Sequence, residues 1–161
     1  MCNEYNKNCK RKPEGIQGNA ACITRNKRKI KMGKEKLARI YKRADILFCN
    51  KDEAQRILEV KDDDIKKLLQ GISSMGPRIV VITDGVRGAY SFDGKEMLFM
   101  TMYPDPKPPI SRTGAGDAFS STFTVALALG KDIKEALRRG PVNSMSVVQG
   151  IGAQAGLLTR E

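Results

Sequence analysis

Apolar and polar positions alternate along this chain with two different periods. Between residues 33 and 44, apolar side chains recur at helical spacing, with Lys and Arg on the opposite face. The apolar run from Asp45 to Cys49 and the β-branched run over residues 78–84 are typical of buried strands. Helices are predicted over 51–60 and 62–75. Asn50 precedes the first of these as an N-cap, and Glu53 completes a capping box.

The second half of the chain continues this alternation of strands and helices. Two strands joined at an Asp-Gly turn are predicted over 88–100, followed by a proline-rich extended connection over 103–110. A long apolar helix opens at Gly114 and ends at Gly130. Two further helices are predicted over 132–139 and 141–149, the second with Pro141 in its first turn. The pattern therefore predicts a three-layer α/β fold with a largely parallel sheet and residues 79–83 as a central strand.

The N-terminal segment differs from the rest of the chain in both pattern and charge. Residues 1–28 show neither period and offer few large apolar side chains to offset the entropy of ordering. We therefore expect a basic, flexible segment over 1–28, open to proteolysis near residues 27–31, and a folded domain over 29–161. The net charge of +11 resides in residues 1–43, whereas residues 44–161 are balanced. A nucleic-acid partner is not expected, because the basic arm provides only Tyr5 and Tyr41 for base stacking.

Composition excludes several kinds of site. The chain of 161 residues contains no His, which excludes Ser-His-Asp and Cys-His catalysis and any His-ligated metal. Its four Cys, at 2, 9, 22 and 49, have no zinc-site spacing, and Cys49 is predicted to be a buried small side chain. No apolar run is long enough to span a membrane, and no export signal is recognised. We expect reduced thiols and a cytoplasmic location.

The segment from Thr113 to Asp117 carries the most chemical information. Glycines flank Ala115 at the start of a helix, where backbone N–H groups and the helix dipole can hold a phosphate. Asp117 lies at the same terminus, where the dipole keeps a carboxylate ionised and able to accept a proton. Phosphoryl transfer needs such a pair. From the residues alone, tight helix packing with Asp117 as a dipole-matched residue is an equal alternative.

Four ordered motifs resemble those of the ribokinase-like, or PfkB, carbohydrate kinases. The sequence SRTGAGDAF resembles the family's D-T-x-G-A-G-D-x-F signature, and Asn50 to Glu53 resembles its N-x-x-E motif. Residues 83–88 resemble its T-x-G-x-x-G nucleotide segment, and residues 143–153 resemble its closing helix and Gly-Ala loop. The resemblance covers residues 30–158, and four motifs in order are far more specific than any one of them.

The resemblance implies an ATP-dependent phosphotransferase that moves the γ-phosphate to a hydroxyl of a small sugar or nucleoside. Asp117 would be the catalytic base, and Asn50 and Glu53 would organise Mg²⁺ through water. The anion hole would consist of Gly114, Ala115 and Gly116. The nucleotide would contact Thr83, Gly85, Gly88, Asn143, Gly152 and Ala153. The residues alone leave a simple capping box at Asn50 and a simple turn after Thr83 as alternatives.

Two departures from the family pattern limit what the resemblance implies. Ser111 stands where the family signature has an Asp that helps to hold a monovalent cation, so a requirement for such a cation is doubtful. Family members are also much longer, and this chain lacks their sugar-binding half and small β lid. We therefore expect a truncated ribokinase-like fold, whose transfer module is incomplete in this chain. The alternative is a non-catalytic nucleotide-binding remnant without an acceptor site. The identity of the acceptor and a homo-oligomeric state stay open.

Overall fold

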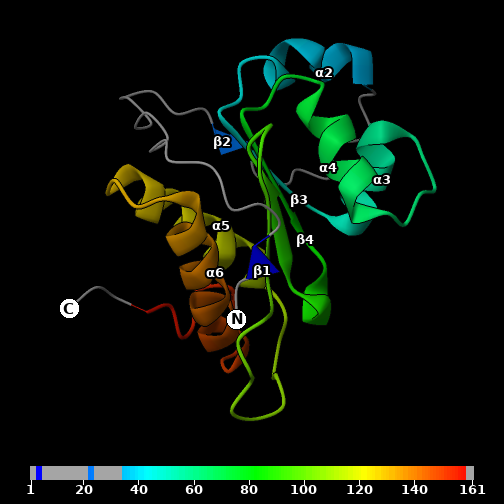
Figure 1. Ribbon diagram of the computed structural model, residues 1–161. Helices are drawn as coiled ribbons and strands as arrows, with labels where there is room; N and C mark the ends of the chain where they lie inside the picture. The colour runs from blue at the N-terminus through cyan, green and yellow to red at the C-terminus, as the bar shows by residue number, and fades with distance from the viewer. Residues whose placement is uncertain (1–2, 5–21, 24–33, 159–161) are drawn as a thin grey trace.

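The computed structural model describes residues 3–4, 22–23 and 34–158 (Figure 1). The strands form one six-stranded sheet in the order β1–β6–β5–β4–β3–β2. Helices cover both faces of this sheet, so the predicted three-layer α/β fold is confirmed. Apart from β1 and β2, residues 1–28 lie outside the described part of the chain. The prediction of a flexible segment there, and its boundary at residue 29, therefore stay predictions.

One half of the sheet is parallel. It consists of β2 (Cys22–Ile23), β3 (Ile46–Asn50) and β4 (Ile79–Thr83). Strand β4 lies between β3 and β5, which confirms its predicted interior position. Asn50 is paired with Thr83 at the last register position of β3 and β4. Two polar residues therefore end neighbouring strands at the same edge of the sheet.

The other half of the sheet is antiparallel, so the prediction of a largely parallel sheet is wrong for this half. Strands β5 (Ala89–Phe92), β6 (Met97–Met100) and β1 (Asn3–Glu4) pair antiparallel from β4 outward. The reason is that short turns, η1 (Gly85–Arg87) and the predicted Asp-Gly turn, link β4, β5 and β6. A parallel pair would require a long crossover connection.

Three helices cover one face of the sheet (Figure 1): α2 (Lys34–Tyr41), α3 (Lys51–Leu58) and α4 (Ile65–Ser73). Alternate strand residues point to this side because side chains along a strand alternate between its two faces. Cys49 is buried here as predicted, and burial raises the pKa of its thiol. The core on this face includes Leu47, Cys49, Val80, Ile82, Leu68, Leu69 and Ile72.

Helices α5 (Ala115–Ala128) and α6 (Ile133–Val148) cover the opposite face. The rings of Phe48 from β3 and Phe123 from α5 meet edge to face, with centroids 5.4 Å apart. Burying a side chain of this size contributes about 1.5–3 kcal/mol. The core on this face includes Ile46, Phe48, Ile79, Val81, Phe119, Phe123, Ala136 and Leu137.

Residues 133–148 form one helix, so the prediction of separate helices over 132–139 and 141–149 is wrong. Pro141 lies inside α6 and cannot donate the backbone hydrogen bond that an interior residue normally makes. Ala136 and Leu137 are fully buried before the proline, and Val147 and Val148 are buried after it. Packing on both sides of Pro141 offsets the cost of the lost bond, and the helix continues.

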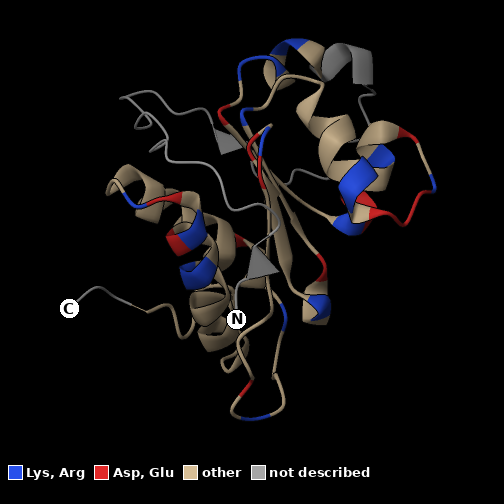
Figure 2. Ribbon diagram, viewed as in Figure 1, with Lys and Arg blue, Asp and Glu red and all other residues tan. Residues whose placement is uncertain are grey.

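Charged side chains on the helical surfaces are mixed. Figure 2 shows Lys or Arg beside Asp or Glu on both α3 and α6. Within the part of the chain that the structure describes, no helix has the length and apolar character needed to cross a membrane.

Candidate active site

A cavity of about 790 Å³ lies at the carboxyl ends of β3 and β4, beside the start of α5. Ligands of open α/β sheets bind at this edge. The cavity is lined by two strand ends, the segment after β6, and parts of α5 and α6. These lining residues are Asn50, Lys51, Asp52, Thr83, Asp84, Gly85, Val86, Arg87, Met102, Tyr103, Pro104, Asp105, Arg112, Ala115, Gly116, Phe119, Ser144, Met145 and Val148.

The structure brings only some of the sequence-predicted site residues to this cavity. Asn50, Thr83, Gly85, Ala115 and Gly116 line it. The remaining predicted residues are near it in the chain but outside its lining: Glu53, Gly88, Gly114, Asp117, Asn143, Gly152 and Ala153.

The first turn of α5 has backbone amides with no hydrogen-bond partner among the described residues. Gly114 is the N-cap at φ 87°, and no side chain caps the helix. The N–H of Ala115 makes only a long bond of 3.4 Å to the carbonyl of Arg112. The amides of Gly116 and Asp117 donate to no residue that the structure describes. Free first-turn amides at a positive helix end can bind an anion.

Gly114 has a structural role beside this anion site. A Cβ at this position would lie 2.4 Å from the carbonyl oxygen of Ala153. Only glycine therefore lets the start of α5 approach the loop that contains Gly152 and Ala153. Ala153 therefore packs against the first turn of α5 from outside the cavity lining.

Asp117 lies in the same first turn, one residue after Gly116. The residue is exposed, and its carboxylate makes no hydrogen bond or ion pair with any described residue. Its backbone carbonyl accepts a bond from the Ser120 hydroxyl at 3.1 Å, as part of the helix. The carboxylate is therefore accessible and uncommitted at the end of the helix that carries the free amides.

Asn50 and Glu53 form the predicted capping box at the start of α3. Asn50 Oδ1 accepts from the Glu53 N–H at 2.8 Å, and the Glu53 carboxylate accepts from the Asn50 N–H at 3.0 Å. Glu53 is 3% exposed, and only Asn50 reaches the cavity. The capping box is thus confirmed, whereas the role of the pair at Mg²⁺ stays a prediction.

Asp52 is a cavity residue that sequence reasoning missed. Its side chain is exposed, lines the cavity and pairs with no described residue. The signal that could have identified Asp52 is its place in the first turn of a helix that directly follows a strand. Its free carboxylate adds an oxygen donor to the cavity beside Asn50.

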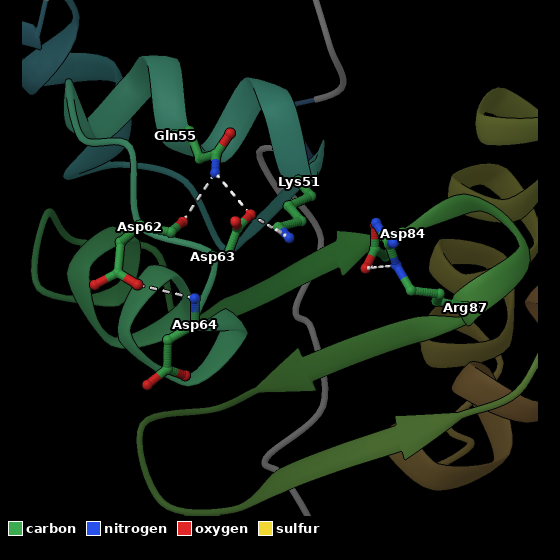
Figure 3. Close-up of polar contacts among 7 residues, drawn as sticks. All are labelled: Lys51, Gln55, Asp62, Asp63, Asp64, Asp84 and Arg87. Atoms are coloured by element: carbon green, nitrogen blue, oxygen red, sulfur yellow. Dashed lines mark hydrogen bonds and ion pairs between the residues drawn. The ribbon is translucent and has the colours of Figure 1, made fainter.

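The turn after β4 is held by polar contacts (Figure 3). Two Arg87 nitrogens donate to the two Asp84 carboxylate oxygens, each at 2.7 Å. Gly88, at φ 112°, is required because its Cβ would lie 2.3 Å from the Met100 carbonyl oxygen. Gly85, at φ 56°, has open space where its Cβ would be, and with Thr83 it faces the cavity.

Asn143 links α6 to two other segments. Its Nδ2 donates to Thr122 Oγ1 of α5 at 2.7 Å, and its Oδ1 accepts from the Leu158 N–H at 3.0 Å. Its neighbours Ser144 and Met145 line the cavity instead. The predicted nucleotide contact of Asn143 therefore stays a prediction. Its observed hydrogen bonds join α6 to α5 and to the segment that contains Leu158.

Lys51 lines the cavity, and its side chain forms an ion pair with Asp63 in the loop before α4. Figure 3 shows its ammonium group beside the Asp63 carboxylate, which also accepts from Gln55 Nε2 at 3.3 Å. The hydrogen bond and charge of Lys51 hold the pKa of Asp63 below its usual value. Asp63 is highly exposed, so solvent screens this pair and its contribution to stability is small.

Many α/β proteins bind phosphate groups where a helix N-terminus opens on the carboxyl edge of parallel strands, and the start of α5 has this arrangement. Residues 16–160 match the family model described as pfkB family carbohydrate kinase. The chain belongs to this family.

Individual relatives agree with this assignment. Ribokinase of Bacillus subtilis (strain 168) is 44% identical over 85 residues, which are 52% of this chain and 28% of the relative. A nucleoside kinase from Methanocaldococcus jannaschii, an archaeal member of the ribokinase family, has a similar fold. The TM-score is 0.74 at 23% identity, over 88% of this chain and 45% of that one. A putative ribokinase II from E. coli in complex with ATP and Mg²⁺ has a TM-score of 0.68 at 22% identity. The match covers 77% of this chain and 39% of that one. The chain thus spans less than half the length of these relatives.

Proposed function

We propose that this chain holds ATP and carries the phosphoryl-transfer centre of a sugar or nucleoside kinase. The observation that carries the proposal is the first turn of α5. The amides of Gly116 and Asp117 donate to no described residue, they belong to the helix end that lines the cavity, and the Asp117 carboxylate beside them also has no described partner. An anion site beside a free base is the pair that phosphoryl transfer requires. Membership in a kinase family supports the same conclusion.

The reaction assigns one task to each part of this helix end. An acceptor hydroxyl oxygen attacks the γ-phosphorus, its proton passes to the Asp117 carboxylate, and a new P–O bond forms. The bond from the γ-phosphorus to the bridging oxygen breaks, and ADP leaves. Backbone amides near Gly116 stabilise the charge on the equatorial phosphoryl oxygens during transfer. The base matters because the hydroxyl oxygen becomes nucleophilic as it loses its proton.

The side-chain oxygens of Asn50, Asp52 and Glu53 suit a Mg²⁺ ion that retains several water ligands. Both partner oxygens of the capping box already accept hydrogen bonds, so Asn50 and Glu53 would hold the ion through water. Asp52 offers a free carboxylate in the same wall. When bound, Mg²⁺ neutralises phosphate charge during transfer. Ser111 Oγ accepts from the Thr113 N–H at 3.2 Å, and this neutral group supplies no carboxylate for a monovalent cation.

Relatives include a ribokinase and a nucleoside kinase, so sugar and nucleoside acceptors both fit the proposal. The non-catalytic alternative, a chain that binds ATP but transfers nothing, is decided by the same measurements. The cytoplasmic location and a homo-oligomeric state also stay predictions.

The test is titration calorimetry with ATP and Mg²⁺, followed by ADP release with a panel of sugars and nucleosides. We expect ATP binding, and transfer to one class of acceptor. Ala115→Asp should abolish ATP binding while keeping the fold, because a carboxylate at a helix N-terminus favours the helix but repels phosphate. The matched control is Lys66→Asp in the first turn of α4, outside the cavity lining. Absence of ATP binding at millimolar concentrations would refute the proposal, and binding without transfer would select the alternative.

A further inference from the structure

We propose that Arg112 binds the terminal phosphate of the nucleotide at the start of α5. This inference rests on the proposed function and adds to it a side chain outside the predicted anion hole. The starting observation is that three cationic side chains line the cavity: Lys51, Arg87 and Arg112. Their partners differ, and this difference identifies the one that is available to a ligand.

Two of the three cations are already neutralised. The Lys51 ammonium pairs with Asp63, and its side chain is only 17% exposed. The Arg87 guanidinium makes two hydrogen bonds of 2.7 Å to Asp84, in a geometry that uses both carboxylate oxygens. Their positive charge is offset by these carboxylates, so each attracts a phosphate less strongly than an unpaired guanidinium does.

Arg112 has no such partner among the residues that the structure describes. It is exposed and lines the cavity, and its side chain makes no ion pair or hydrogen bond within the described ranges. Two carboxylates of the same cavity, Asp52 and Asp105, do not pair with it either. All five guanidinium N–H donors are therefore without a partner among the described residues and are available to a ligand of the cavity.

The backbone fixes Arg112 at the start of α5. The N–H groups of Ile110 and Ser111 both donate to the Val148 carbonyl at the end of α6, at 2.8 and 3.3 Å. The Ser111 hydroxyl then accepts from the Thr113 N–H at 3.2 Å and shapes the turn. These bonds anchor the residues on either side of Arg112, two positions before the N-cap Gly114.

The chemistry of this arrangement selects a phosphate group. A guanidinium binds phosphate through two parallel hydrogen bonds, and the amides of the first turn add donors at the same helix end. A neutral sugar or the base of a nucleoside would leave both kinds of donor without a charged acceptor. The terminal phosphate of a nucleoside triphosphate, with the most negative charge, fits this combination best.

The experiment compares ligands with and without phosphates by titration calorimetry. The ligands are ATP, inorganic tripolyphosphate and adenosine, and the proteins are the wild type, Arg112→Gln, Arg112→Lys and Arg138→Gln. We expect Arg112→Gln to weaken ATP and tripolyphosphate binding about tenfold or more, the effect of losing a charge-assisted hydrogen bond. Adenosine binding should not change. Arg112→Lys should restore part of the loss, because it keeps the charge but not the paired geometry.

The outcomes separate this inference from the proposed function. Arg138 is the control, because it is an exposed arginine of α6 outside the cavity lining. If the wild type binds no ATP, both proposals fail. If the wild type binds ATP and Arg112→Gln binds it equally well, only the role of Arg112 is overturned. Equal losses for ATP and adenosine, or a lowered melting temperature, would also overturn it by indicating a structural role.

Discussion

Two carboxylates in first helical turns, Glu53 and Asp117, have opposite surroundings. Glu53 is buried and accepts a backbone hydrogen bond in a capping box. Asp117 is exposed, and neither its carboxylate nor the amides of Gly116 and Asp117 bond to any described residue. A carboxylate that completes a cap stabilises its helix, whereas an uncommitted one is free to take a proton. The environment, and not the residue type, therefore distinguishes a structural acid from a candidate base.

Asp117→Asn should lower the turnover number by about 10²–10⁴, the usual contribution of general-base catalysis, and leave ATP affinity nearly unchanged. Asn keeps the size and hydrogen-bonding capacity but cannot accept the proton at neutral pH. The measurement is phosphate transfer to the best acceptor, by this chain alone or complemented by the N-terminal half of a relative. Asp132→Asn is the control, because Asp132 caps α6 outside the cavity and Asn caps equally well.

Gly114→Val gives the contrasting result. Its side chain would collide with Ala153 at a φ of 87°, so the start of α5 must move and ATP binding should fall. Full turnover in Asp117→Asn would show that Asp117 is only a dipole-matched residue of the first turn. Loss of ATP binding in that variant, as complete as in Gly114→Val, would lead to the same conclusion.

At the scale of helices and strands, local pattern predicted the elements whose boundaries depend on nearby residues. The N-cap at Asn50, the buried strands β3 and β4, and the Asp-Gly turn are confirmed. The continuous helix through Pro141 could not be predicted, because burial on both sides of the proline decides it. The antiparallel pairing of β4 with β5 was not predicted, because the short turn η1 between them lacks the Asp-Gly signal that marked the β5–β6 hairpin.

In the candidate site too, local pattern predicted some features, whereas others depend on how distant segments pack. Strand-end residues such as Asn50 and Thr83 could be predicted to meet, because parallel neighbours end at one edge of a sheet. The contact of Gly114 with Ala153 joins residues far apart in sequence, so it depends on how α5 and α6 pack. Whether Arg112 pairs with Asp52 or Asp105 likewise depends on where the fold places these side chains in the cavity, which no local pattern predicts.

Packing between α5 and α6 predicts the effect of a single methyl group. A Cβ at Gly140 would lie 2.7–2.9 Å from three ring atoms of Phe119, which is itself buried against the sheet. Gly140→Ala should therefore destabilise the fold by about 1–3 kcal/mol, as overpacking usually does, although Ala favours a helix. Because Phe119 lines the cavity, ATP affinity should fall as well.

The control for this prediction is Gly71→Ala in α4. A Cβ there would meet only the flexible end of Leu58, 2.9 Å away, which can rotate aside. Helix propensity should then dominate, and stability should be unchanged or rise by up to about 1 kcal/mol. Urea unfolding of both variants measures the difference. Equal stability of Gly140→Ala and Gly71→Ala would contradict the close α5–α6 contact.

For the whole molecule, the two cores share the strands β3 and β4. Alternate residues of each strand face α3 and α4 on one side and α5 and α6 on the other. The cavity lies where both layers reach the carboxyl ends of these strands. Residues from either layer can therefore contribute to one ligand, and a ligand bound there would stabilise both layers together.

Charge is the other property of the whole molecule, and it leads to the last prediction. The excess of +11 lies in residues 1–43, while the helices of the body carry mixed charges (Figure 2). Any attraction to a polyanion should therefore depend on the N-terminal cluster. Two variants remove four charges each by Gln substitution. One changes Lys27, Arg28, Lys29 and Lys31, and the other changes the exposed body residues Lys61, Lys66, Lys131 and Arg138.

Clustered cations release bound counterions from a polyanion together, so the first variant should lower the salt dependence of heparin binding by up to about four units of slope. The second should change it little, because nearby carboxylates already balance the body. The measurement is the affinity for heparin at several salt concentrations. Because each variant loses four positive charges, the two variants have the same net charge. Equal effects of both variants would mean that net charge alone governs binding. An effect confined to the body variant would indicate a polyanion site on the folded domain.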